Sequence, residues 1–136
     1  MNAVRQPWFA RALLIGLIYA AIGVAFAAPA NHVRGWRMAA WLTSAAVYAG
    51  HIAYEQIRIG YSRWSTALHV AVAASIGGFG LAVAATIRSM IAPPNYHRAR
   101  FVAALVVWPI VTGAPAFLVA VVASAVLALI LPRRSA

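Results

Sequence analysis

Apolar positions fall into four long runs separated by short polar segments. The runs cover residues 8–28, about 38–59, about 65–91 and about 101–131. Because a helix rises about 1.5 Å per residue, each run can cross the roughly 30 Å hydrocarbon core of a bilayer. Only helices and closed barrels satisfy backbone polar groups in lipid, and the uneven pattern does not fit the alternation of a barrel. The sequence therefore predicts an all-α integral membrane protein with four spans.

The segments that join the runs are short: PANHVRG, RIGYSR and APPNYHRAR. Short connections force neighbouring helices to run antiparallel. We therefore predict one domain, residues 1–136, folded as an up-down-up-down four-helix bundle. Amphipathic rings gather near the predicted helix ends, at the level of the lipid head groups: Trp8, Trp36, Trp41, Tyr61, Trp64 and Tyr96.

The first run has a second interpretation, as a secretory signal peptide. Arg5 and Arg11 precede it, and the segment AFAAPA ends it with a small-residue cleavage pattern. However, the apolar stretch after Arg11 is about 17 residues long, and a signal core usually has 7 to 15. We therefore expect this helix to be retained.

The fourth run is longer than one span needs and contains Pro109 and Pro115. Proline removes a backbone donor and clashes with the preceding turn of a helix. We expect either one kinked helix or a short interfacial helix followed by a span from about Ala114 to Leu131. A broken helix would expose backbone groups to a substrate, whereas a kink alone improves packing, as membrane helices tolerate.

Composition agrees with a membrane protein and excludes several kinds of chemistry. Hydrophobic residues make up 65% of the chain and charged residues 9%, too few charges to cover the surface of a soluble domain of 136 residues. Cysteine is absent, which excludes disulfides, thiolate metal sites and cysteine nucleophiles. One carboxylate cannot supply the acid and base pair of a glycosidase, and no phosphate loop or nucleophile elbow is present. A lipid-acting enzyme using His and Glu is conceivable but not indicated. We do not expect an enzyme.

The net charge of +10 comes from eleven Arg and one Glu. The Arg residues flank the apolar runs, so we interpret them as lipid head-group contacts rather than a nucleic-acid surface. Six Arg on one side of the membrane against five on the other favour both termini in the cytoplasm, and the near balance leaves dual topology open. We expect a bacterial inner membrane, and the Arg-only, Ala-rich usage indicates a GC-rich genome. The side of both termini carries Arg5, Arg11, Arg58, Arg63, Arg133 and Arg134; the other carries Arg34, Arg37, Arg88, Arg98 and Arg100.

Small residues recur at spacings that allow helices to pack closely. Gly16 and Ala20 are four apart, as are Gly23 and Ala27, and SIGGFG places three glycines near the middle of the third run. Helices in lipid associate through close backbone approach. We interpret these positions as a packing face; a hinge or an ion path is the alternative.

Polar residues of the second run form one stripe at 100° per residue: Ser44, Tyr48, His51, Glu55 and Arg58. Glu55 is the only acidic residue of the chain. Such a stripe should avoid lipid and face the bundle interior, a neighbouring subunit or water. His69 in the third run lies at nearly the depth of Glu55, so His51, Glu55 and His69 converge if the two helices are suitably rotated.

Three interpretations of these residues remain open. Intramembrane carboxylates and imidazoles often serve as proton relays, since imidazole titrates near neutral pH. Two imidazoles and a carboxylate are also ligand types for zinc or iron, and paired histidines can hold haem; with too few ligands, we predict no metal and no cofactor. The structural alternative pairs Glu55 with Arg58 or Arg63 at the membrane rim and His69 with Ser65 or a backbone carbonyl.

The size and helix plan resemble those of small multidrug transporters, but that family carries its coupling Glu in the first helix, where this chain has none. The GGF of residues 77–79 resembles fluoride channels, yet GLAVAAT follows it here instead of a Thr/Phe/Ser-rich break. The chain is assigned to neither family. Our best prediction is a proton- or cation-linked transporter or channel using Glu55, His51, His69 and Tyr48. The alternative is a non-catalytic subunit of a larger membrane complex; the expected partners are the lipid bilayer and a second copy or another membrane protein.

Overall fold

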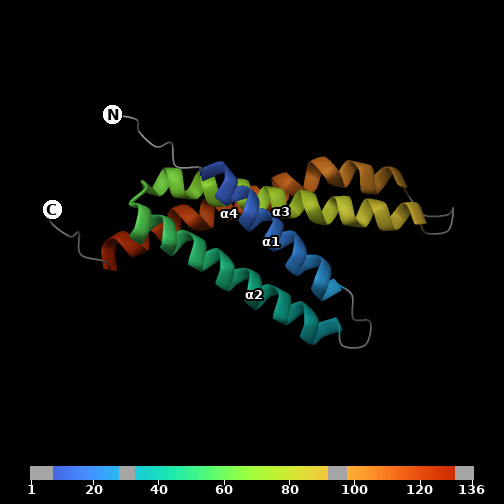
Figure 1. The fold of residues 1–136 in the computed structure, drawn as a ribbon, viewed down its shortest axis with the longest axis horizontal. Helices are drawn as coiled ribbons and strands as arrows, with labels where there is room; N and C mark the ends of the chain where they lie inside the picture. The colour runs from blue at the N-terminus through green and yellow to red at the C-terminus, as the bar shows by residue number, and fades with distance from the viewer. Residues whose placement is uncertain (1–7, 28–32, 92–97, 131–136) are drawn as a thin grey trace.

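The computed structural model describes residues 8–27, 33–91 and 98–130, and all of its regular elements are helical. They are α1 (Trp8–Ala27), α2 (Val33–Ala53), a π-helical turn η1 (Tyr54–Ile59), α3 (Arg63–Ile91) and α4 (Arg98–Ile130). Successive helices run in opposite directions (Figure 1). The predicted all-α, up-down-up-down bundle is therefore confirmed.

Helix boundaries extend beyond the apolar runs at several points. The second helix begins at Val33 instead of about Met38, and the fourth begins at Arg98 instead of Phe101. Backbone hydrogen bonding does not stop where the lipid-facing sequence does, so an apolar run underestimates its helix. The third helix begins at Arg63 because the Ser62 hydroxyl accepts a hydrogen bond from the backbone N–H of Ser65 at 3.2 Å, an N-cap contact.

Three of the described helices are long and apolar enough to cross a membrane. They lie at Trp8–Phe26, Arg63–Ile91 and Arg100–Ile130, with mean hydropathies of 2.1, 2.0 and 2.4. The second helix is not among them, since Arg34, Arg37 and His51 make it less apolar. The coarse class of membrane-compatible helical protein is therefore supported, while a fourth span formed by α2 stays a prediction.

The third helix lies at the centre of the bundle and packs closely against α1 and α4. A Cβ atom added to Gly16 of α1 would lie 2.6 Å from the Ile76 Cβ and 2.8 Å from the Ala73 carbonyl oxygen. One added to Gly77 would lie 2.6 Å from the Tyr19 Cβ, and Gly78 faces Thr112 of α4 in the same way. The predicted glycine packing face is therefore present inside the bundle.

The fourth helix is continuous, with Pro109 and Pro115 both inside it. Its axis changes direction where it passes behind α3, between the orange and red parts in Figure 1. The Ser75 hydroxyl donates to the Pro109 carbonyl oxygen at 2.9 Å, and the Thr112 hydroxyl donates to the Ala74 carbonyl oxygen at 3.2 Å. These bonds from and to α3 hold the proline region in place, so the alternative of a helix broken in two is wrong.

The second helix is the least integrated of the four. It is attached at its C-terminal half, where Ile52 joins a buried apolar cluster with Ala67, Val70 and Ala120. Toward its N-terminus it leaves α3 and α4 and stays beside α1 (Figure 1), where the rings of Phe26 and Trp36 lie 5.4 Å apart. Trp41 is 78% exposed and Leu42 67%. The contacts of α2 with α3 and α4 therefore lie at one end of the bundle, while α1 contacts the other end of this helix.

Candidate functional site

The candidate site lies where η1 meets the first turns of α3. Gly60 ends η1 in a left-handed conformation, with φ of 75°, which glycine adopts without steric cost. The backbone N–H groups of Gly60 and Tyr61 both bond to the Glu55 carbonyl oxygen. This tight turn sends the chain directly back into α3, so Glu55 and His69 face each other across neighbouring helices.

Glu55 sits in a π-helical turn, where each N–H bonds to the carbonyl five residues earlier. More residues per turn mean a smaller rotation per residue than the 100° of an α-helix. Arg58 therefore does not return to the face that Glu55 occupies, and its side chain is exposed. The predicted stripe is correct for His51 and Glu55, which are buried, and wrong for Arg58.

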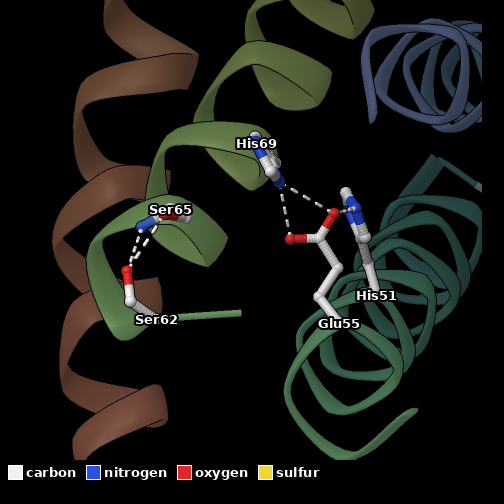
Figure 2. Close-up of polar contacts among 5 residues, drawn as sticks. All are labelled: His51, Glu55, Ser62, Ser65 and His69. Carbon is white, nitrogen blue, oxygen red and sulfur yellow. Dashed lines mark hydrogen bonds and ion pairs between the residues drawn. The ribbon is translucent and has the colours of Figure 1, made fainter. Parts of the chain in front are cut away.

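The three predicted ionisable residues come together in one buried cluster (Figure 2). The His69 Nδ1 lies 3.1 Å from Glu55 Oε1 and 2.9 Å from Oε2, so one ring nitrogen contacts both carboxylate oxygens. The His51 Nε2 lies 3.3 Å from Oε1. Glu55 is only 1% exposed, and both histidines are buried. A carboxylate between two imidazoles is therefore enclosed by protein.

Within the described residues, both ion pairs of Glu55 are with histidines. The alternative in which Glu55 pairs with Arg58 or Arg63 at the membrane rim is wrong, because both arginines are exposed while the carboxylate points inward. Ser65 does not bond to His69 either; its hydroxyl lies 3.0 Å from that of Ser62 in the cap of α3. Within the described residues, Glu55 therefore contacts imidazole groups and no guanidinium group.

Two aromatic rings hold His69 in place. The Trp8 ring stacks on the imidazole with centroids 4.7 Å apart and planes inclined by 12°. Tyr61 meets the imidazole edge-on, with centroids 5.0 Å apart. These two ring contacts therefore fix the orientation of the imidazole that contacts Glu55.

His51 is held less completely than His69. Its Nε2 is near Glu55, but the contact lacks the alignment of a hydrogen bond, and within the described residues neither of its buried ring nitrogens has a hydrogen-bond partner. The two imidazoles are therefore inequivalent. One is locked to the carboxylate, and the other has hydrogen-bonding capacity to spare.

The remaining predicted site residues have other positions. The Tyr48 hydroxyl donates to the Ala116 carbonyl oxygen of α4 and so joins two helices instead of contacting Glu55. Arg58 in η1 and Arg63 at the start of α3 are exposed, and Arg11 in the first turn of α1 is partly buried. Arg5, Arg133 and Arg134 lie outside the described residues. In the part of the chain that the structure describes, no group of three or more His, Cys, Asp or Glu residues is arranged to hold a metal ion.

Trp8 and Tyr61 belong to the site, although the sequence indicated only interfacial anchors at these positions. Both flank helix ends, which is the usual setting of membrane-interface rings. The spacing of 61 residues between Trp8 and His69 carries no sequence signal of a ring contact. Only the parallel packing of α1 on α3 brings the two rings together.

Comparison with known proteins finds no match: no protein family, no curated protein and no solved structure. The site geometry is therefore the basis for the function proposed below.

Proposed function

We propose that this protein is a small proton-linked membrane transport protein or channel, in which Glu55 and its two histidines take up and release the proton. The observation that carries the proposal is the contact of His69 Nδ1 with both oxygens of a carboxylate that is 1% exposed. A hydrogen bond between an acid and a base of this kind is a path along which a proton moves.

The choice of partner supports this function over a purely structural ion pair. The chain has eleven Arg, and Arg58 and Arg63 follow Glu55 closely in the sequence. The carboxylate is nevertheless paired with imidazoles. Arginine keeps its charge at every physiological pH, so an Arg pair would be permanent. Histidine gains and loses charge near neutral pH, so the pair can be made and unmade by protons.

Protonation can be coupled to movement because the cluster joins two helices that share few other contacts. Glu55 belongs to η1 and His69 to α3, while the N-terminal part of α2 lies away from α3 and α4. A change of charge at the cluster alters the attraction between these two elements. We infer that α2 with η1 is the part that shifts when the proton arrives or leaves.

The experiment is proton flux into liposomes containing the purified protein and a pH-sensitive dye. Glu55→Gln, which keeps the shape and removes the ionisable group, is expected to abolish flux. Arg58→Gln is the matched control, because it removes a charge from the same turn at an exposed position. Unchanged flux in Glu55→Gln, or no flux above empty liposomes in the unmodified protein, would disprove the proposal.

A second function, that of a non-catalytic subunit in a larger membrane complex, is favoured by α2 itself. This helix carries exposed Trp41 and Leu42 but is less apolar than the three membrane-compatible helices. A protein partner lying along α2 would cover it better than lipid. Cross-linking in native membranes from a photoreactive residue at position 42 tests this idea, with Leu129 of α4 as the exposed control position. A partner captured from both positions or from neither would contradict it.

A further inference from the structure

Apart from Ser65, whose hydroxyl bonds to that of Ser62, the hydroxyl groups on the described parts of α3 and α4 fall into two sets. The first set is satisfied by backbone carbonyls: Thr86 donates to Ala82 at 2.7 Å, Ser89 to Thr86 at 2.7 Å, Ser75 to Pro109 at 2.9 Å and Thr112 to Trp108 at 2.8 Å. This is how Ser and Thr normally behave in membrane helices, where a hydroxyl without a partner is costly.

The second set has no such partner. The hydroxyls of Thr66 and Ser124 lie on residues that are 0% exposed, and neither has a hydrogen-bond partner among the described residues. The same is true of both ring nitrogens of His51 and of the Tyr19 hydroxyl. Buried polar groups in proteins are normally paired, so four such residues in one small bundle require an explanation.

Three of these residues lie one helical turn from residues of a known buried contact. The apolar cluster of Ile52, Ala67, Val70 and Ala120 brings α2, α3 and α4 together. Thr66 lies one turn before Val70 and Ser124 one turn beyond Ala120, so the antiparallel packing of α3 and α4 places both on the same side of this cluster. His51 lies one turn before Glu55 and contacts its carboxylate. Tyr19 lies on α1, where it packs against Gly77 of α3.

We propose that His51, Thr66 and Ser124 bind internal water next to the Glu55 carboxylate. Internal waters in proteins typically satisfy two to four otherwise unpaired polar groups, and these side chains supply both donors and acceptors. Resting on the function proposed above, this water passes the proton to and from the cluster at His51. The transported species is then the proton itself, passed through hydrogen bonds, rather than a metal cation held by oxygen ligands.

The sign of a stability change distinguishes a hydrated site from a dry one. Thr66→Val has nearly the same shape as the original side chain but no hydroxyl. At a dry site it removes an unpaired polar group and raises the melting temperature of the purified protein. At a hydrated site it breaks bonds to water and lowers the melting temperature, which is the result we expect. An unchanged or raised melting temperature would overturn the proposal.

Thr86→Val is the matched control for this measurement. Its hydroxyl bonds to the Ala82 and Phe101 carbonyl oxygens within protein, so the loss there involves no water. Magnetisation transfer from water in solid-state NMR of the unmodified protein in liposomes provides a readout that needs no variant. Strong transfer to the side chains of Thr66 and Ser124, with little to Thr86, supports the proposal. Transfer to Thr66 and Ser124 that is absent, or no stronger than the transfer to Thr86, contradicts it.

Flux separates the failure of this inference from the failure of the proposed function. We expect the Thr66→Val, Ser124→Ala double variant to lose most of its proton flux, roughly tenfold or more. A side chain positioned for proton transfer contributes at least that much to the rate of an enzymatic reaction. Thr66→Ser combined with Ser124→Ala, which has a hydroxyl group at position 66, should recover the proton flux. If the double variant conducts normally while Glu55→Gln does not, the transport function stands and the water path is wrong.

Discussion

The two sides of α3 show two ways of holding a membrane bundle together. On one side, glycines bring α3 into close contact with α1 and α4, and the hydroxyls of Ser75, Thr86 and Thr112 bond to backbone carbonyls. On the other, α2 and η1 meet α3 near one end, through the apolar contacts of Ile52 and through a buried ion cluster. The first arrangement is fixed by shape, whereas the second also contains ionisable groups. On the function proposed above, the second is the one that responds to protons.

The difference also separates rigid from movable parts. Close backbone approach leaves little room for movement, since a Cβ added at Gly16 or Gly77 would lie within 3 Å of atoms of the neighbouring helix. On the function proposed above, the cluster has more than one state, according to which of its groups holds the proton. We therefore expect substitutions in the glycine interface to change stability alone, and substitutions in the cluster to change both the position of α2 and proton flux.

The largest stability effect is expected from His69→Leu, which removes the main partner of a buried carboxylate. Breaking one side of a buried pair typically costs about 3 to 5 kcal/mol. Since the chain has no cysteine, a single cysteine at position 52 reports whether the α2 contact opens. In the His69→Leu variant, the labelling rate of the cysteine at position 52 should rise by about two orders of magnitude or more, as that free energy implies. Leu68→Ala, an exposed neighbour, is the control; equal labelling in both variants would show that the cluster does not hold α2.

The glycine interface should respond next most strongly. Gly16→Ala places a methyl group 2.8 Å from the Ala73 backbone oxygen, a contact that no side-chain movement relieves. Overpacking of this kind costs about 1 to 3 kcal/mol of unfolding free energy. Gly50→Ala is the matched control: nothing lies within 4 Å of its added methyl group, so the better helix former should stabilise by roughly 0.5 to 1 kcal/mol. Unfolding in mixed detergent micelles measures the change in unfolding free energy for both variants. Changes of the same sign would contradict the expectation that only Gly16 lies in a close-packed interface.

A smaller effect is expected from Tyr48→Phe, which deletes the hydrogen bond from α2 to the Ala116 carbonyl oxygen of α4. Interhelical hydrogen bonds in membranes contribute about 0.6 to 2 kcal/mol. A double-mutant cycle with Glu55→Gln, read out by unfolding, tests whether the two attachments of α2 act together. Strong coupling would mean that α2 docks as one unit. Simple additivity would restrict the movable part to η1.

The smallest effect is expected from Trp8→Leu, which removes the ring stacked on His69. Aromatic pairs contribute about 0.5 to 1.5 kcal/mol beyond their buried area. Trp8→Phe keeps a stacking ring and should recover most of the loss in unfolding free energy. If Leu and Phe at this position behave alike, the stack contributes nothing specific and only apolar burial counts.

The sequence was a good guide to everything that depends on local pattern. Apolar runs too long for a soluble domain placed the helices, and short joining segments required antiparallel neighbours. Small residues at a spacing of four marked the packing face, and the position of His69 one turn into α3 put it at the depth of Glu55. The predictions were less accurate for helix ends, because capping at Ser62 and hydrogen bonding beyond the apolar run follow different rules from hydropathy.

Sequence alone determined that a lone carboxylate and two histidines lie on neighbouring helices at similar depth. It did not determine whether Glu55 turns toward His69 or toward Arg58 and Arg63, since an ideal α-helix allows both. Tertiary structure decided this through the π turn, which changes the rotation per residue and leaves Arg58 outside while Glu55 points inward. It also brought Trp8 onto His69 and left the hydroxyls of Thr66 and Ser124 without a hydrogen-bond partner among the described residues. These contacts join residues far apart in the chain, so no local pattern could specify them.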